Sequence, residues 1–253
     1  MGLSLTNLII LALLFFATSA IGVVTGSNSL ITVPAMFEFG IDEKRAVATN
    51  MFGLVFMAIG GTIPFLRQGS IDKKRVAPLV VLTIISSAIG AALVGLITNQ
   101  GIKIMVSAAM IAIAVFTLVK RDSRAVEGHA ISGRALMLTY LLTFLLGIYG
   151  GLYSGGYVTV LTTVLVAFFG MSFTESVAAT KLINVFSSLI ATIVFAWQGL
   201  IDYGLGIILA VTMFAGGYVG AHYTTRLNEK WIKRIFLSTV FLLALKMLWD
   251  LVK

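Results

Sequence analysis

The sequence TIPFLRQGSID at residues 62–72 recurs as TIVFAWQGLID at residues 192–202, and seven of the eleven positions are identical. The two stretches lie 130 residues apart. Further matches keep that spacing: Gly26 with Gly156, Gly40 with Gly170, and Gly90–Ala91 with Gly220–Ala221. Two copies of one unit therefore fill nearly all of the 253 residues, and such a duplication is typical of secondary transporters.

The composition is that of an integral membrane protein. Hydrophobic residues make up 59% of the chain and charged residues 11%, and the mean hydropathy is +1.04. A soluble domain carries roughly 25% charged residues. Apolar runs of about 20 residues, the length that crosses the hydrocarbon core of a bilayer, recur along the sequence.

The net charge of +8 comes from basic residues in short loops between the apolar runs. This placement indicates positive-inside topology and not nucleic-acid binding. The absence of cysteine excludes disulfides, thiol catalysis and cysteine metal sites. Because no nucleophile, phosphate-binding or zinc motif is present either, we expect neither an enzyme nor a cofactor.

Each half is predicted to contain five apolar segments. They span residues 3–24, 29–39, 45–66, 76–98 and 103–119 in the first half, and 135–153, 159–169, 174–197, 205–225 and 232–251 in the second. The second segment of each half is too short for an upright helix to span a bilayer unaided. A short, broken helix packed inside protein is therefore expected at both places.

The charges of equivalent loops predict that the two halves are inverted. The loop at 67–75 has four basic residues and its counterpart at 198–204 has none. At the next loop the bias reverses, because 99–103 has one lysine and 226–234 has four basic residues. Equivalent loops should thus lie on opposite sides of the membrane, with the basic linker at 120–134 in the cytoplasm.

The predicted fold is all-α, with inverted repeats at residues 1–119 and 135–253 whose broken short helices meet near the bilayer midplane. Inversion requires each half to cross an odd number of times. From this parity we expect the short segments to complete a crossing, which gives about ten segments with both termini outside.

The breaks before the short segments are candidate binding elements, because free N–H groups at a helix N-terminus suit an anion. The candidate residues at the breaks are Ser27, Asn28, Ser29, Gly155, Gly156 and Tyr157. The alternative is that the glycines here only allow close helix packing, as in Gly22-x-x-x-Gly26.

Lys181 is the only charged residue between Glu175 and Asp202. A charge inside a span costs roughly 2.5–3.5 kcal/mol on insertion scales, so a counter-charge for a bound anion is the functional interpretation. The alternative is a snorkelling side chain near the helix start, paired with Glu175. Neighbouring candidates are Thr49, Asn50, Thr180 and Asn184, with Asn50 matching Lys181 after a one-residue slip between the repeats.

Three stretches carry a resemblance to a known family. They are residues 26–49 with Pro34, the run AATKLINVFSSLIATIVFAWQGLID at 178–202, and GGYVGAHYTTRLNEKWIKRIF at 216–236. In these stretches the chain resembles the TauE/SafE (sulfite exporter) membrane proteins. The resemblance implies transport of sulfite or organosulfonates across a prokaryotic cell (inner) membrane. The chain has Ser-Asn-Ser and Gly-Gly-Tyr where the family usually has glycine triplets, which leaves the particular substrate open.

The expected function is alternating-access transport of a small sulfur-containing anion, with the lipid bilayer as the other partner. An anion channel and a non-transporting scaffold or assembly factor remain as alternatives. Transition-metal transport is disfavoured by the lack of cysteine and by only two histidines. The sequence decides neither the direction of transport nor whether the protein is a homodimer.

Overall fold

The computed structural model describes residues 4–26, 28–67, 71–119 and 132–223, together with the isolated residues 241 and 249. Those ranges contain nine helices and no strand. The helices are α1 (Leu5–Thr25), α2 (Ser29–Glu38), α3 (Glu43–Arg67), α4 (Lys73–Val94), α5 (Asn99–Val119), α6 (Gly133–Leu152), α7 (Tyr157–Phe168), α8 (Phe173–Trp197) and α9 (Tyr203–Tyr223). They lie within a few residues of the predicted segments. The predicted tenth segment, 232–251, lies outside the described residues except for the isolated residues 241 and 249.

Seven of these helices are long and apolar enough to cross a membrane, whereas α2 and α7 have only 10 and 12 residues. The long helices turn apolar side chains outward, as at Ile85, Leu145 and Val211, which are 53%, 52% and 65% exposed. An apolar outer surface on apolar helices is suited to lipid and not to water. The protein is therefore a multi-pass membrane protein, as predicted.

Side chains cap the N-termini of all seven long helices. The capping residues, from α1 to α9, are Ser4, Asp42, Asp72, Thr98, Ser132, Ser172 and Asp202. Each accepts a hydrogen bond from a backbone N–H of the first turn, which would otherwise be unpaired. The short helices α2 and α7 have no side-chain cap.

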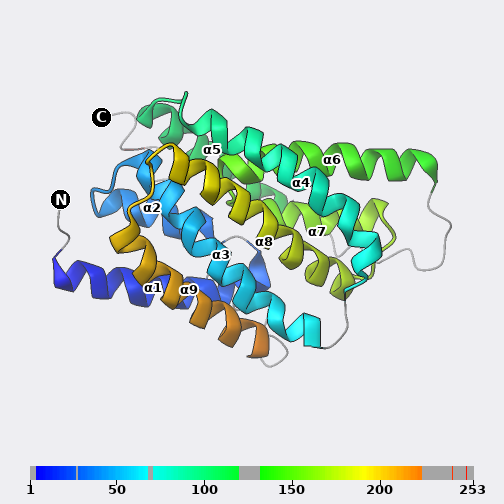
Figure 1. The fold of residues 1–253 in the computed structure, drawn as a ribbon, viewed down its shortest axis with the longest axis horizontal. Helices are drawn as coiled ribbons and strands as arrows, with labels where there is room; N and C mark the ends of the chain where they lie inside the picture. Colours follow the sequence, from blue (N-terminus) through cyan, green and yellow to red (C-terminus); the bar gives the residue numbers. More distant parts are fainter. Residues whose placement is uncertain are drawn as a thin grey trace.

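Helices α3 and α8, which hold the same place in the two repeats, pack against each other and run in opposite directions (Figure 1). Thr49 at the start of α3 accepts a 3.0 Å hydrogen bond from the N–H of Asp202, which follows α8. At the other end, Arg75 at the start of α4 donates to the carbonyl of Phe169, which precedes α8. We call these two extremities the Asp42 end and the Arg75 end.

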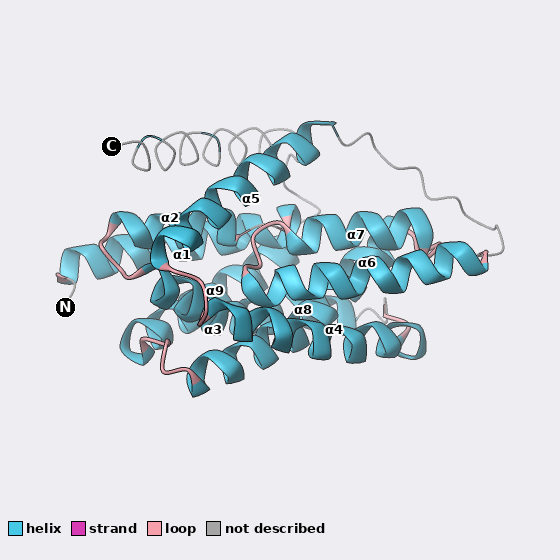
Figure 2. Ribbon diagram, turned by 90° about the horizontal axis from the view of Figure 1, so that it is seen from above, coloured by secondary structure: helices cyan, strands magenta, loops and turns pink. Residues whose placement is uncertain are grey.

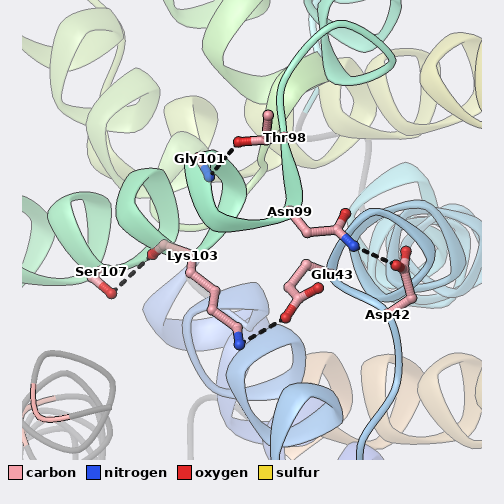
Figure 3. Close-up of polar contacts among 7 residues, drawn as sticks. All are labelled: Asp42, Glu43, Thr98, Asn99, Gly101, Lys103 and Ser107. Atoms are coloured by element: carbon pink, nitrogen blue, oxygen red, sulfur yellow. Dashed lines mark hydrogen bonds and ion pairs between the residues drawn. The ribbon is translucent and has the colours of Figure 1, made fainter. Parts of the chain in front are cut away.

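Polar contacts join the loops of the Asp42 end (Figure 3). Asn99 donates a 2.5 Å hydrogen bond to the Asp42 carboxylate, and Lys103 pairs with Glu43 at 2.8 Å. Gln198 donates to carbonyls at the last turns of α4, at 3.3–3.4 Å. These contacts tie α3, α4, α5 and α8 together where they meet.

The α1–α2 pair is a hairpin that begins and ends at the Asp42 end. Helix α1 runs parallel to α9, since Gly216 faces Phe16 and Gly220 faces Ala20. Helix α9 in turn runs parallel to α3, and the loop after α2 leads straight into α3. Figure 2 shows α1 and α2 lying on the N-terminal side of the molecule.

The α6–α7 pair is the matching hairpin at the Arg75 end, because α6 runs parallel to α4 and α7 leads into α8. The prediction that the short segments complete a crossing is therefore wrong: each short helix turns back to the end from which its hairpin started. The first half still runs from one end of the molecule to the other an odd number of times, because α3, α4 and α5 follow the hairpin.

The helix pairings occur in matching sets. Helix α1 packs on α9 as α6 packs on α4, and α3 packs on α9 as α8 packs on α4. Small residues allow these contacts at the Ser86/Gly90 and Gly216/Gly220 faces. A Cβ at Gly90 would lie 1.9 Å from the Ile148 carbonyl oxygen, and one at Gly220 would lie 2.2 Å from that of Ala20.

The two ends differ in charge over the described residues. The Arg75 end carries the basic Arg67, Lys73, Lys74, Arg75 and Arg134 with the acidic Asp72 and Glu175. The Asp42 end carries the basic Lys44, Arg45 and Lys103 with the acidic Glu38, Asp42, Glu43 and Asp202. Only the Arg75 end has an excess of positive charge.

Candidate substrate-binding site at the paired helix breaks

Each hairpin turns at a glycine that the sequence repeat places in matching positions. Gly26 ends α1 with φ of 75°, and Gly156 precedes α7 with φ of 81°. Both values lie in the left-handed region, which glycine adopts without the steric cost of a Cβ. Neither break provides a side-chain cap, so the first turns of α2 and α7 lack the side-chain acceptor that each long helix has. The Tyr157 N–H of α7 donates instead to the Ser154 carbonyl at 3.2 Å.

The two breaks lie in direct contact, although about 125 residues separate them in sequence. The hydroxyls of Ser29 and Ser154 are 2.8 Å apart, and the Tyr153 hydroxyl donates to the Ser29 carbonyl at 2.8 Å. A Cβ at Gly26 would lie 2.9 Å from the Thr159 hydroxyl oxygen. The uncapped ends of α2 and α7 therefore meet in one buried region.

Asn50 on α3 holds the start of α2. Its amide nitrogen donates to the Ser29 hydroxyl at 2.9 Å, and its amide oxygen accepts from Thr32 at 2.6 Å. All three side chains are buried. Because both ends of the Asn50 amide are engaged, this residue joins α3 to the first turn of α2.

The second repeat has an equivalent contact, in which the hydroxyls of Thr162 on α7 and Thr180 on α8 lie 3.1 Å apart. Both contacts join residues 18 apart, and the pairs are offset by 130. The predicted one-residue slip is therefore wrong: Asn50 corresponds to Thr180, and Lys181 corresponds to Met51. The equal bounds of α3 and α8 under the same offset agree with this register.

Sequence reasoning missed Thr32, Thr162 and Tyr153. The first two could have been found, because they are threonines at the repeat spacing, one turn inside each short helix. No sequence signal distinguishes Tyr153, whose role depends on the contact between the two breaks.

Lys181 is buried, and only 4% of the residue's surface is exposed to solvent. Within the described ranges it makes no hydrogen bond or ion pair. The Glu175 carboxylate, which was a possible partner, instead accepts from the N–H and hydroxyl of Ser172 at 2.8 and 2.9 Å. The alternative of a pair with Glu175 is therefore wrong, and the ammonium group of Lys181 can still donate hydrogen bonds.

Lys181 begins a polar stripe along one face of α8, continued at helical spacing by Asn184, Ser188 and Thr192. All four are at most 9% exposed. The corresponding residues of α3 are Met51, Leu54, Ala58 and Thr62. The polar stripe therefore belongs to one repeat only, and packing alone does not require it.

The remaining predicted site residues are spread more widely. Thr49 accepts from Asp202 N–H beside the loop before α9, away from the breaks. A Cβ at Gly155 would lie 2.8 Å from Leu30, so this glycine allows the breaks to touch. Tyr157 turns its ring onto Gly150. Ser27 lies outside the described residues.

Asn28 faces α1 at the first break. Its amide nitrogen lies 3.5 Å from the Ser19 hydroxyl, while its buried amide oxygen has no hydrogen-bond partner in the described part of the chain. The paired breaks thus combine two uncapped helix N-termini with buried hydroxyls and amides. Such N-termini carry partial positive charge, so the arrangement suits a small anion. No group of His, Cys, Asp or Glu suited to a metal ion occurs among the described residues.

The chain is similar to known membrane transporters along nearly its whole length. The profile of the family "Sulfite exporter TauE/SafE" matches residues 10–247. A "Probable membrane transporter protein ORF9" from Sinorhizobium is 26% identical over 95% of this chain and 93% of its own. "Probable membrane transporter protein YfcA" from Escherichia coli K12 is 22% identical over 98% and 93%, and a "Probable membrane transporter protein" from Haemophilus influenzae is 23% identical over 95% of both chains.

No solved structure matches the chain. The family match runs through both sequence repeats and includes the two breaks, Lys181 and the stripe on α8. With that match over most of its length, this chain belongs to the TauE/SafE family of membrane transporters.

Proposed function

We propose that this protein carries a small sulfur-containing anion, sulfite or an organosulfonate, across the cell (inner) membrane by alternating access. The observation that carries the proposal is the contact between two uncapped helix N-termini, with Ser29 and Ser154 2.8 Å apart, in a chain that caps its seven long described helices. The family description, which names a sulfite exporter, supports the choice of a sulfur oxyanion.

In this proposal the anion binds at the paired breaks. The uncapped N-termini of α2 and α7 face its oxygens, with Asn28, Ser29 and Thr180 close by. Lys181 supplies the full positive charge, and Asn184 a further amide. Lys181 carries this role because it is buried without an acidic partner among the described residues.

The proposed transport cycle uses inverted repeats. Support comes from the antiparallel course of the equivalent helices α3 and α8 and from hairpins that start at opposite ends. The excess of basic residues supports a cytoplasmic location for the Arg75 end. In this proposal the basic linker 120–134 is cytoplasmic as well. Each state of the cycle would then expose the breaks to one end.

Export is the favoured direction on electrical grounds. With a negative cell interior, the outward movement of an anion gains about 2.3 kcal/mol per charge per 100 mV. Export therefore needs no coupled ion, which fits the absence of any carboxylate among the candidate residues. The direct packing of one break on the other favours a carrier over a continuously open channel.

The test is flux of sulfite and methanesulfonate into proteoliposomes containing wild type, Lys181→Met, Lys181→Arg or the control Lys74→Met. Met is the residue at the corresponding place in the first repeat. We expect saturable flux in wild type and control, loss in the Met variant and partial activity in the Arg variant. Saturable flux that is equal in all four proteins would refute the role of Lys181, and no flux in wild type would refute the proposed substrates.

A further inference from the structure

A second group of buried polar side chains lies between α4, α7 and α8, beside the breaks but outside the contacts described above. It consists of Thr83 and Ser87 on α4, Tyr157 on α7 and Ser187 on α8, which we call the hydroxyl cluster. None of the four is more than 1% exposed. Burial of a hydroxyl in an apolar environment is unfavourable unless it is hydrogen-bonded.

One side of the hydroxyl cluster is satisfied. Ser87 donates to the Gly147 carbonyl of α6 at 3.0 Å, which uses its one proton. The 2.7 Å contact between Ser87 and Ser187 is then a hydrogen bond donated by Ser187. These two serines therefore join α4, α6 and α8 and have no proton left to donate.

The other side of the cluster is unsatisfied. The Tyr157 hydroxyl lies beside Thr83 and Ser187, but the hydroxyls of Tyr157 and Thr83 make no hydrogen bond of acceptable geometry with any part of the described chain. Several other buried helix threonines donate to the carbonyl four residues back, namely Thr18, Thr62, Thr139 and Thr162. Thr143 and Thr192 have unpaired hydroxyls like Thr83. Because Thr83 makes no such bond, its proton and that of Tyr157 are available to an acceptor.

The hydroxyl cluster joins α4 of the first repeat to α7 and α8 of the second, and it is not repeated at the equivalent place on α9, α2 and α3. The residues that correspond to Thr83, Ser87 and Ser187 are Met213, Gly217 and Met57. Apolar or small residues thus stand at these three equivalent positions, where the same helix pairings recur, and Ser27, the counterpart of Tyr157, lies outside the described residues. Packing between these helices does not require hydroxyls, and a polar ligand would account for the unpaired hydroxyls of Thr83 and Tyr157.

The cluster adjoins the uncapped N-terminus of α7. Tyr157 is the first residue of that helix, and its ring lies on Gly150 of α6, where a Cβ would be 2.9 Å from the ring. Helix side chains lean toward the N-terminus of their helix, so the Tyr157 side chain lies toward the uncapped end of α7.

We propose that Thr83 and Tyr157 donate hydrogen bonds to an oxygen atom of the carried oxyanion, with Ser187 as the positioning residue that holds α8 against α4. This inference rests on the proposed function and extends its site. It assigns recognition of the oxyanion to two neutral donors, Thr83 of the first repeat and Tyr157 of the second, in addition to Lys181 and the helix N-termini.

The test is methanesulfonate flux in proteoliposomes containing wild type, Thr83→Val, Thr83→Ser and Tyr157→Phe. The control is Thr139→Val, whose hydroxyl is equally buried but bonds to its own helix. We expect the Val and Phe variants to raise KM about tenfold or more with kcat nearly unchanged, the size expected for one lost hydrogen bond to a charged partner. The Ser variant and the control should keep the wild-type KM.

Other outcomes overturn the inference in distinguishable ways. Wild-type flux with an unchanged KM in both Thr83→Val and Tyr157→Phe would refute the cluster and leave the proposed function standing. No wild-type flux of methanesulfonate or sulfite would refute both. If Thr83→Val does not fold, Tyr157→Phe decides the question alone, because it removes one oxygen atom and keeps the ring.

Discussion

Replacement of Asn50 by alanine should weaken the attachment of α2 to α3. The side chain makes two buried hydrogen bonds, at 2.9 Å to Ser29 and at 2.6 Å from Thr32. Each bond contributes about 0.5–1.5 kcal/mol in proteins, and about 0.6 on average between helices in membranes. Ser29 keeps its contact with Ser154, and Thr32 lies 3.4 Å from the Asn28 carbonyl, so neither is left without a partner. We expect Asn50→Ala to lower the free energy of unfolding by about 1–2 kcal/mol.

The second repeat supplies a matched comparison. Thr180 stands at the position of Asn50 and contacts Thr162 at 3.1 Å, so Asn50→Thr can rebuild one such contact with Thr32. This variant should lose about half as much stability as Asn50→Ala. Ser107→Ala is the control, since that buried hydroxyl bonds only to the Lys103 carbonyl of its own helix.

The assay is reversible unfolding of the purified protein in mixed detergent micelles, followed by the change in helical circular dichroism. An Asn50→Ala variant as stable as wild type would refute the reasoning, because the two hydrogen bonds would then contribute nothing. An Asn50→Thr variant no better than Asn50→Ala would refute the correspondence between Asn50 and Thr180.

Four further changes test the fold. Asp72→Ala should lower stability by about 1 kcal/mol, because Asp72 accepts from two N–H groups of α4; equal unfolding midpoints would contradict this. Gly220→Val should cost about 1–3 kcal/mol, since its Cβ would lie 2.2 Å from a carbonyl of α1, and an unchanged melting temperature would show that α1 and α9 do not pack closely. Glu43→Gln should cost at most about 1 kcal/mol, and less at high salt, because the pair with Lys103 is partly exposed; a larger, salt-independent loss would be unexpected. In whole cells, an impermeant thiol reagent should label Arg45→Cys but not Lys74→Cys, and the reverse pattern would overturn the orientation.

Most of the helices could be predicted from the sequence because a bilayer fixes their length and composition. Apolar runs of about 20 residues, interrupted by charged loops, leave little choice of boundary. The two caps Asp72 and Asp202 were equally predictable, since each stands just before an apolar run. The break glycines Gly26 and Gly156 were marked by the repeat itself.

The course of the short helices could not be predicted from loop charges. These charges indicate only on which side of the membrane a loop lies, and not the path of the chain between two loops. The number of crossings in a half is odd in both cases: five if α1 and α2 each cross before α3, α4 and α5, and three if α1 and α2 turn back. The direction of α1 is determined by its packing along α9 through Gly216 and Gly220. This contact involves no charged residue, so the charge pattern cannot predict it.

The register between the repeats was also misjudged at one place. The shared dipeptides Ala48–Thr49 and Ala179–Thr180 favour a one-residue slip, whereas the hydrogen bonds of Asn50 and Thr180 require none. The sequence comparison matches Thr49 with Thr180 because the two residues are identical. In the structure, however, it is Asn50 that holds the place of Thr180. With the slipped register, the sequence does not reveal that the polar stripe beginning at Lys181 corresponds to the mainly apolar residues Met51, Leu54, Ala58 and Thr62 of the first repeat.

The central claim is that the two helix breaks meet and form the anion site, and a disulfide between them tests it most directly. The natural chain has no cysteine, so Ser29→Cys with Ser154→Cys gives a single pair at positions whose hydroxyls are 2.8 Å apart. Methanesulfonate flux should be measured before oxidation, after oxidation and after reduction, with each single variant as control; sulfite is unsuitable because it cleaves disulfides. The account predicts that the disulfide forms, abolishes flux and releases it again on reduction. A pair that does not cross-link, or a cross-linked protein that transports normally, would contradict it.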